Sequence, residues 1–253
     1  MRIDQEKLTE IRTHCYTVRG KKFLSKRSFQ SLLGKLFHVH KCVKAARVFM
    51  NRMLDLFRRN VSKKNIWLTK EFYDDLDWFC NFLDVFNGVT ILEKSLLFDS
   101  HEIFLDACLT GVGGIWRDRC YAAPFPAING FSTKIVHLEM INLVVAFGDW
   151  GSIWAGKNEV INCDNAAVVH VTNTGKTRDL FLGACVRILW WICAYWDINL
   201  AVRHVSGIYN IIADSLSRLF SESPVNLSLI KNLKESLIWE HITPNHFSLT
   251  LYF

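Results

Sequence analysis

Hydrophobic residues recur at helical spacing through the first third of the chain. From Ser25 to Arg59 apolar side chains return every three or four positions, which is typical of one or two amphipathic helices. A further helix is predicted from Thr69 to Phe86, ended by Asn87-Gly88. Residues 1 to 24 show weaker periodicity, which predicts a partly ordered lead-in.

After Glu93 the pattern changes to short apolar runs that are typical of strands. The runs 96–100 with 102–109, 111–118 and 120–125 predict an antiparallel meander with glycines at its turns. Strands and helices then alternate, which predicts an α/β fold with a mixed sheet covered on both faces. The expected elements are a helix from His137 to Trp154, a strand 159–164, helices 165–172 and 179–196, a strand 198–205 and a last helix 210–220.

One apolar run, Leu180 to Trp196, resembles a membrane span. It is short for a bilayer, contains Arg187 near its middle, and is followed at once by Asp197. A helix buried in a protein core is therefore predicted, and no membrane partner. The segment after Pro224 is amphipathic and then aromatic, and its pattern indicates no function.

Composition and charge refine this picture. A chain of 253 residues with 50% hydrophobic and 13% aromatic residues can bury the core of one large domain or two modest ones. Residues 1 to 64 carry 17 Lys and Arg against 4 Asp and Glu, whereas the remaining residues carry 13 against 20. The basic front suggests contact with phosphates, although a solvated helix face would have the same composition. The acidic remainder is compatible with metal binding.

The eight cysteines are scattered and form no CxxC pair. With no signal peptide in the sequence, we expect a reduced intracellular protein, cytoplasmic or nuclear, without a zinc site or a disulfide framework. His38, His40 and Cys42 lie close together in a helical pattern but lack a second pair of ligands, so a surface or packing role is predicted for them.

The string Phe72-Tyr73-Asp74-Asp75 invites comparison with the YxDD signature of polymerases. That signature needs a tight hairpin between strands, whereas Phe72 and the apolar residues after it follow a helical stripe. We therefore expect Asp74 and Asp75 to be ordinary solvated acids on a helix.

Four carboxylates stand in segments that could build a metal site. Asp106 interrupts an apolar strand, where a buried charge is costly unless a partner compensates it. Glu139 is predicted in the first turn of a helix, Asp164 at the end of a strand before a helix, and Asp214 in the last predicted helix. Each has a plain structural explanation alone, with Asp164 a good helix N-cap, but hydrolysis with a divalent-metal pair needs several such acids at one point.

Four segments carry a resemblance to a known family. FLDACLTGVGG, HLEMINLVVAFGDW, CDNAAVVHVTNTGKTR and RHVSGIYNIIADSLSR, in this order, resemble the ribonuclease H domain of retroelement reverse transcriptases of the DIRS and gypsy types. The segments SLLGKL, AARVFMNRMLDLFR and DLDWFCNFL are similar to the part that joins the polymerase to its ribonuclease H. The resemblance covers roughly residues 25 to 220.

This resemblance implies a ribonuclease H-like five-stranded mixed sheet flanked by helices, preceded by a basic helical subdomain. The expected domains are a connection or thumb-like segment 1–94, a ribonuclease H-like domain 95–220 and a C-terminal tail 221–253. The implied activity is Mg²⁺-dependent cleavage of the RNA strand of RNA/DNA hybrids, with two ions, for which Mn²⁺ could substitute. The implied ligands are Asp106, Glu139, Asp164 and Asp214.

The implied partner is an RNA/DNA hybrid, with a polymerase-bearing chain of the same element as a further candidate. Selection of RNA requires contacts to 2′-hydroxyl groups, for which Asn165 and Asn173 are candidates. Phosphates would be held by a basic front, of which the main candidates are Lys44, Arg47, Arg58 and Arg59, together with Lys21, Lys22, Lys26, Arg27 and Lys41.

The sequence departs from the family pattern in three places. Ile208 follows Gly207, where cellular relatives commonly place a histidine, and Cys108 stands where a small hydroxyl residue is frequent. His204 is expected to be structural. The chain contains no polymerase palm, so DNA synthesis by this chain is not expected. Two alternatives stay open: a catalytically inactive nucleic-acid-binding fragment, and a transposase or resolvase nuclease, which shares the acids but not the ADSLSR ending.

Overall fold

The computed structural model describes residues 2–89, 103–126, 134–221, 227–243 and 247. It divides into two compact units, Met1–Ser95 and Leu96–Phe253. The apolar run 96–100, predicted as part of a strand, lies outside the described residues.

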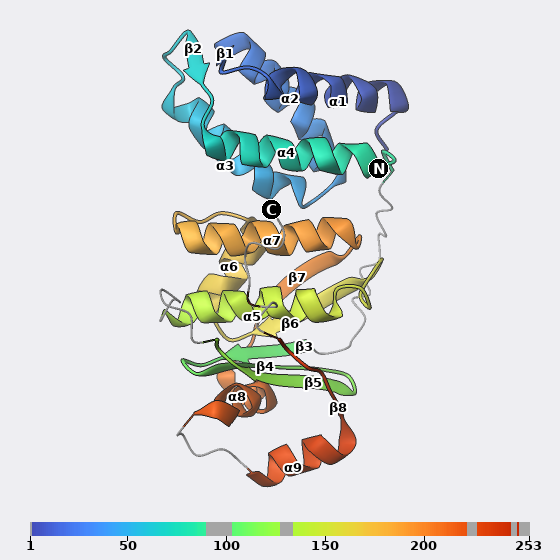
Figure 1. The fold of residues 1–253 in the computed structure, drawn as a ribbon, viewed down its shortest axis with the longest axis vertical. Helices are drawn as coiled ribbons and strands as arrows, with labels where there is room; N and C mark the ends of the chain where they lie inside the picture. Colours follow the sequence, from blue (N-terminus) through green and yellow to red (C-terminus); the bar gives the residue numbers. More distant parts are fainter. Residues whose placement is uncertain (1, 90–102, 127–133, 222–226, 244–246, 248–253) are drawn as a thin grey trace. The chain divides into compact units, whose positions relative to one another are not determined.

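The first unit is built from helices and one small sheet (Figure 1). Strands β1 and β2 pair antiparallel. The helices pack around buried phenylalanines, which include Phe29 of the second helix, Phe49 of the third and Phe72 of the fourth. The elements are α1 (Gln5–Arg19), β1 (Phe23–Ser25), α2 (Lys26–Cys42), α3 (Ala46–Arg59), β2 (Asn65–Trp67) and α4 (Lys70–Val85).

Helix α1 corrects the prediction of a partly ordered lead-in. The carboxylate of Asp4 caps the helix by accepting a hydrogen bond from the backbone N–H of Lys7 at 2.8 Å. One face of the helix is buried, through Leu8, Ile11, Cys15 and Val18. The spacing of these four residues is helical, but their signal is weak in sequence because charged residues surround them and one of the four is a cysteine.

Asp75 corrects a second prediction. The segment is the helix α4, so the polymerase-like interpretation of the string is wrong, as expected. Asp75, however, is fully buried and forms an ion pair with Arg52 of α3, whose Nε donates to Oδ2 at 2.7 Å. Asp74 is the solvated acid of the two, in an ion pair with Lys70 one turn earlier.

The second unit contains a six-stranded mixed sheet of order β7-β6-β3-β4-β5-β8 (Figure 1). Strands β3, β4 and β5 form an antiparallel meander, and β6 pairs parallel with β3 and with β7. This is the α/β fold with a mixed sheet that was predicted, and it is compatible with a ribonuclease H-like arrangement, with six strands where five were expected. The strands are β3 (Ile103–Ala107), β4 (Gly111–Trp116), β5 (Arg119–Pro124), β6 (Asn158–Cys163), β7 (Asn199–His204) and β8 (Ile238–Trp239).

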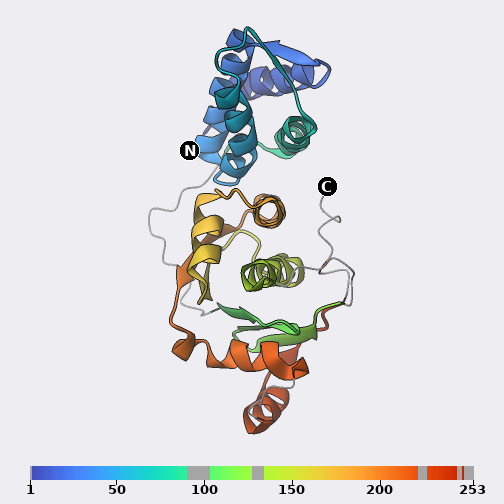
Figure 2. The same cartoon turned by 90° about the vertical axis from the view of Figure 1, so that its left-hand side faces the viewer.

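Helices cover both faces of this sheet (Figure 2). Helix α5 packs on β3 and β4, and α7 packs against α5, while α8 crosses the opposite face over the same two strands. Trp150 and Trp154 are fully buried at the end of α5. The helices are α5 (Ile135–Trp150), α6 (Ala166–Thr174), α7 (Leu180–Tyr195), α8 (Ile211–Ser217) and α9 (Leu227–Ser236), with short 3₁₀ turns at Gly207–Tyr209 and Arg218–Phe220.

Gly113 and Gly114 lie inside strand β4, whereas Gly111 follows the turn between β3 and β4, where the sequence predicted glycines. A methyl group on Gly113 would meet the backbone N of Ser217 at 2.5 Å, Cβ of Leu216 at 2.6 Å and the carbonyl oxygen of Ala213 at 2.7 Å. The glycine therefore allows helix α8 to lie directly on the sheet. This close approach brings the residues of α8 next to the central strand β3.

The segment after Pro224, to which the sequence assigned no function, is part of the second unit. Helix α9 buries Ile230 and Leu233 against Cys120 of β5 and Leu216 of α8. Strand β8 then pairs parallel with β5. The helix 210–220 is thus not the last one in the chain.

All eight cysteines are free thiols. In the parts of the chain that the structure describes, no helix combines the length and the apolar character needed to cross a bilayer. The run from Leu180 forms the helix α7, which buries Leu182, Val186 and Leu189.

Candidate metal centre

Asp106 is the fourth residue of the central strand β3 and is only 7% exposed. Burial raises the pKa of its carboxyl group to about 7, and the charges of Asp164 and Asp214 add to this effect. The hydroxyl of Ser217 opposes it by donating a hydrogen bond to Oδ2 at 2.6 Å. The surroundings of Asp106 therefore do not fully stabilise the charged form of its carboxylate.

Glu139 reaches the same region from helix α5 and is also 7% exposed. The helix begins at Ile135, so Glu139 lies in its second turn and not in the first turn that was predicted. Burial raises the pKa of Glu139 to about 7, with Asp164 and Asp106 as further contributors. Asn165 donates to its Oε1 at 3.2 Å.

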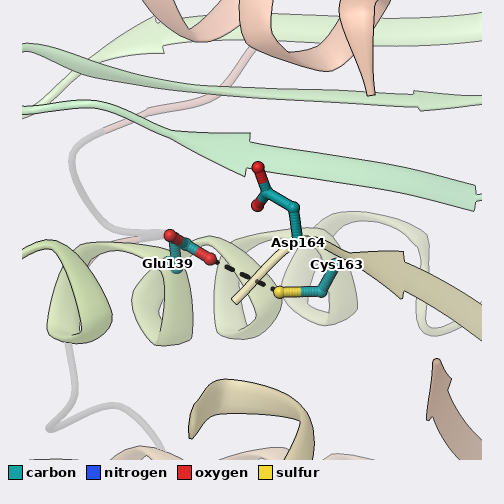
Figure 3. A group of neighbouring side chains, drawn as sticks. All are labelled: Glu139, Cys163 and Asp164. Carbon is teal, nitrogen blue, oxygen red and sulfur yellow. Dashed lines mark hydrogen bonds between the residues drawn. The ribbon is translucent and has the colours of Figure 1, made fainter. Parts of the chain in front are cut away.

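Asp164 follows the last residue of β6, at the carboxyl edge of the sheet. Ligand atoms of Glu139, Cys163 and Asp164 all lie within 4.8 Å of one another (Figure 3). Asp164 was considered a good N-cap, but the cap of α6 is Asn165, whose Oδ1 accepts from the backbone N–H groups of Ala167 and Val168. The carboxylate of Asp164 is therefore not used for capping.

Asp214 comes from the first turn of α8, on the other face of the sheet. Its Oδ1 accepts from Nε of Arg218 at 2.7 Å, in an ion pair of which both members are about two-fifths exposed. Oγ of Ser217 lies 2.9 Å from the backbone oxygen of Asp214 and 2.6 Å from Oδ2 of Asp106. One serine thus connects the segments that carry two of the predicted acids.

The structure brings the four predicted acids to one end of the central strand. They come from β3, α5, the end of β6 and α8. Of the four, Glu139 and Asp164 have ligand atoms within 4.8 Å of each other. Asp106 and Asp214 lie near enough for charge to matter, because the charges of Asp164 and Asp214 contribute to the raised pKa of Asp106. Such a group of like charges is unfavourable unless protons or cations neutralise it. The arrangement could hold a divalent metal.

The donor chemistry fits a hard cation. Carboxylate oxygens are the ligands that Mg²⁺ and Mn²⁺ prefer, and each of the four acids offers at least one such oxygen. The soft donor in the group is the thiol of Cys163, but burial raises its pKa, so it stays protonated. It donates to Oε2 of Glu139 at 3.4 Å (Figure 3) and is a partner of the acid, not a ligand.

Three residues that support the acids were not singled out from sequence. Asn142, one turn after Glu139, is fully buried and donates to the backbone oxygens of Asp106 at 2.7 Å and of Gly113 at 2.9 Å. Asn210 donates to the backbone oxygen of Leu105 at 3.0 Å. The third residue is Ser217. In the sequence, Asn142 follows Glu139 at helical spacing, which was a signal that the two share a helix face. Asn210 and Ser217 stand a few positions before and after Asp214, which was a signal for these two residues.

Both asparagines proposed to contact 2′-hydroxyls have their amide groups engaged within the protein. Asn165 caps α6 through Oδ1 and donates to Glu139 through Nδ2. Asn173 binds the outer edge of β7, where Nδ2 donates to the carbonyl oxygen of Val202 at 2.6 Å and Oδ1 accepts from its N–H at 3.0 Å. These contacts give the two residues structural roles.

The candidate phosphate-binding residues of the first unit are exposed. Lys44 and Arg47 lie at the start of α3, and Arg58 and Arg59 at its end. Arg58 pairs with Asp55 at 3.2 Å in an open ion pair. Eleven residues separate Arg47 from Arg58, so these two lie on nearly the same side of the helix, about 17 Å apart along its axis.

The loop after β7 borders the acids. A methyl group on Gly207 would lie 3.4 Å from Oδ2 of Asp164, so this turn passes directly beside that carboxylate. Ile208 and Tyr209 follow with 68% and 71% exposure. His204, exposed at the end of β7, donates from Nε2 to the backbone oxygen of Asp164 at 3.1 Å, which agrees with a structural role.

No protein-family model matches the sequence, and no curated protein matches it. Among solved structures, the foamy viral protease-reverse transcriptase dRH in complex with ds DNA is similar to this chain, with a TM-score of 0.31 and 12% sequence identity. The match covers 81% of this chain and 35% of that one, so this chain spans about a third of the length of its counterpart. A similarity at this level does not establish a shared function.

Proposed function

We propose that this chain is a divalent-metal-dependent nuclease of the ribonuclease H type, which hydrolyses the RNA strand of RNA/DNA hybrids. The observation that supports this most strongly is the convergence of Asp106, Glu139, Asp164 and Asp214 at the end of strand β3. Burial and the charges of neighbouring acids raise the pKa values of Asp106 and Glu139, and of the four acids only Asp214 forms an ion pair with a cation among the described residues.

The four carboxylates would hold two Mg²⁺ ions, which when bound supply charge neutralisation for an attacking water and for the leaving oxygen. The protein's own contribution is to fix the acids. Ser217 orients Asp106, Asn165 and Cys163 orient Glu139, and Asn142 fixes the strand that carries Asp106. Hydrogen bonds of this kind around ligands limit the reorganisation needed on binding.

The choice of substrate rests on the sequence segments that resemble retroelement ribonuclease H. Two features of the structure are compatible with a hybrid: the partly exposed carboxylate of Asp164 that follows strand β6, and exposed cations on α3 that match a phosphate backbone in charge. We propose that Arg47 and Arg58 contact phosphates without reading sequence.

The test compares a labelled RNA/DNA hybrid, duplex DNA and single-stranded RNA, each with Mg²⁺, with Mn²⁺ or with EDTA. We expect cleavage of the hybrid's RNA strand alone, only with metal, and a loss of about a thousandfold or more in Asp106→Asn and Asp164→Asn. Asp118→Asn is the matched control, since this acid is exposed on the turn between β4 and β5 and lies outside the group. Cleavage that survives either site substitution would disprove the site.

The same assay decides between the enzyme and an inactive binding fragment. If the chain bound the hybrid in EDTA but did not cleave it with either metal, the nuclease proposal would be wrong and the binding fragment would be the correct interpretation. Cleavage of duplex DNA in preference to the hybrid would instead support a transposase-like nuclease.

A further inference from the structure

The small sheet of the first unit exposes two aromatic rings to solvent. Strands β1 and β2 place Phe23 directly opposite Trp67, and the ring centroids lie 5.5 Å apart. Leu24 and Ile66, on the other face of the same strands, are buried against the unit. Phe23 is 46% exposed and Trp67 is 67% exposed.

Packing within the protein accounts for only part of this arrangement. A cross-strand aromatic pair stabilises a two-stranded sheet, but small β-branched residues also suit an outward face and expose far less apolar surface. Two large rings that face water together are unusual on a protein surface and are typical of a binding site.

Lysines stand at both ends of the small sheet, next to the aromatic pair at one end and next to Ser25 and Asn65 at the other. Lys21 and Lys22 precede β1, and Lys63 and Lys64 precede β2, so the antiparallel pairing sends the two groups to opposite ends of the sheet. The backbone contacts show this directly, because the N–H of Leu68 donates to the oxygen of Lys22 at 3.0 Å. All four side chains are exposed, and none has an acidic partner among the residues described.

An open hollow lies beside Phe23. It has a volume of about 390 Å³ and combines the apolar ring with cations and with small hydrogen-bonding groups. The residues that line it include Lys21, Lys22, Phe23, Ser25, Ser28 and Asn65.

We propose that this aromatic and lysine-rich face binds single-stranded nucleic acid, with bases stacked on Phe23 and Trp67 and phosphates beside the lysines. Lysines alone would suit any nucleic acid, but exposed rings favour unpaired bases, because the bases of a duplex are already stacked on one another. This goes beyond hybrid cleavage, since the unit that carries the face contains none of the four acids.

The experiment measures binding of the full chain, in EDTA, to labelled dT and rU oligonucleotides of about 16 nucleotides and to a blunt DNA duplex of the same length. We expect Phe23→Ala/Trp67→Ala to bind both single strands about tenfold more weakly or worse, and the duplex within about twofold of the unaltered chain. Equal affinities for rU and dT are expected if stacking dominates.

The choice of substitution separates stacking from simple apolar contact. Trp67→Phe keeps an aromatic face and should retain most of the affinity, whereas Trp67→Leu keeps apolar area without a ring and should lose it. This pair also preserves the test if the double alanine variant fails to fold. Phe37→Ala is the matched control, because Phe37 is 50% exposed on the same unit with Lys41 5.5 Å from its ring centroid.

Charge is tested with Lys22→Gln/Lys64→Gln, for which the slope of log affinity against log salt should fall by about 0.7 for each phosphate that is no longer neutralised. Three results would overturn the proposal: unchanged single-strand affinity in the double alanine variant, an equal decrease for duplex, or full affinity in Trp67→Leu. The last would identify an apolar docking surface for a protein. Because metal is absent throughout, these outcomes do not depend on whether the second unit cleaves hybrids.

Discussion

The hydroxyl of Ser217 lies 2.6 Å from Oδ2 of Asp106 although 111 residues separate the two in sequence. This contact exists because Gly113 lets helix α8 lie directly on the sheet. It fixes one oxygen of Asp106, which is as buried as Glu139, and it opposes the rise in the pKa of Asp106 that burial causes.

Replacing Ser217 should therefore weaken the metal site without unfolding the protein. We expect Ser217→Ala to lower Mg²⁺ affinity and hybrid cleavage by about 10-fold to 100-fold, as removal of a hydrogen bond to a ligand usually does. Isothermal titration with Mn²⁺ measures the metal affinity, and the cleavage assay measures the rate of hybrid cleavage. Ser236→Ala, which removes a hydroxyl that binds only the backbone of α9, should leave both unchanged.

Without metal, the chain should lose stability as the pH rises. Asp106 and Glu139 have ordinary pKa values of 3.8 and 4.5, and burial with neighbouring charges raises both to about 7 in the folded protein. The folded state therefore binds more protons than the unfolded state between these values, so the stabilisation present below about pH 4 is lost as pH rises through about 7. Urea unfolding in EDTA should give a free energy of unfolding lower by a few kcal/mol at about pH 8 than at about pH 5.

Two changes should reduce this pH-dependent loss of stability. Asp106→Asn replaces a titrating group with a neutral one and should flatten the pH dependence, and Mg²⁺ should restore stability in the unaltered chain at high pH. A free energy of unfolding that rises between the two pH values would contradict the coupled site.

The ion pair of Arg52 and Asp75 should be essential to the first unit. Asp75 is fully buried, so Arg52→Ala leaves a carboxylate without its cation and should lower the free energy of unfolding by about 3 to 5 kcal/mol. Lys70→Ala is the control, because its partner Asp74 is solvated and such pairs contribute about 0 to 1 kcal/mol. Similar decreases in the free energy of unfolding of both variants would show that the burial of Asp75 does not increase the contribution of its ion pair.

Gly113 and Gly34 should respond to alanine in opposite directions. At Gly113 the added methyl would meet α8 at 2.5 to 2.7 Å, so the helix must move, with a decrease in stability of roughly 1 to 3 kcal/mol and a fall in cleavage. Gly34 lies inside α2 with nothing within 4 Å of the new methyl, so alanine should stabilise the chain by about 0.5 to 1 kcal/mol. Chemical unfolding of the two variants measures whether each substitution raises or lowers the free energy of unfolding.

The cations of α3 should contribute to hybrid binding through salt-dependent contacts. Arg47→Gln/Arg58→Gln should weaken binding in EDTA and lower the salt slope by about 0.7 to 0.9 for each phosphate that the variant no longer neutralises. Lys231→Gln/Lys234→Gln on α9 removes the same charge from the second unit and should have a smaller effect. An unchanged slope in the arginine variant would mean that this side of α3 is only solvated surface.

Periodicity predicted the fold well where one face of an element is buried. The helices around Phe29 and Phe72 and the strands around Asp106 follow from local pattern alone. Other features depend on contacts between distant segments. Asp75 looks solvated until Arg52 is placed beside it, and the glycines of β4 look like turn residues until α8 crosses them. The two-residue strand β8 is too short for any sequence signal.

The four acids could be predicted because each stands in a distinctive segment, whereas the contacts of their supporting residues could not be predicted, although their spacing was a weak signal. Asn142, Asn210 and Ser217 are ordinary polar residues whose importance lies in the backbone and carboxylate groups that they reach. Asn165, a candidate for contact with 2′-hydroxyls, also has contacts that the sequence did not predict, because its amide binds Glu139 and caps α6.

The sheet of the second unit leaves neither border open along its whole length. Strand β8 covers part of β5, and the amide of Asn173 occupies the outward N–H and carbonyl of Val202 in β7, as a peptide group of a neighbouring strand would. Exposed strand borders are templates on which other chains add and aggregate. Strand β8 and the amide of Asn173 therefore reduce the pairing of sheets between separate copies of the chain. This favours solubility at high concentration.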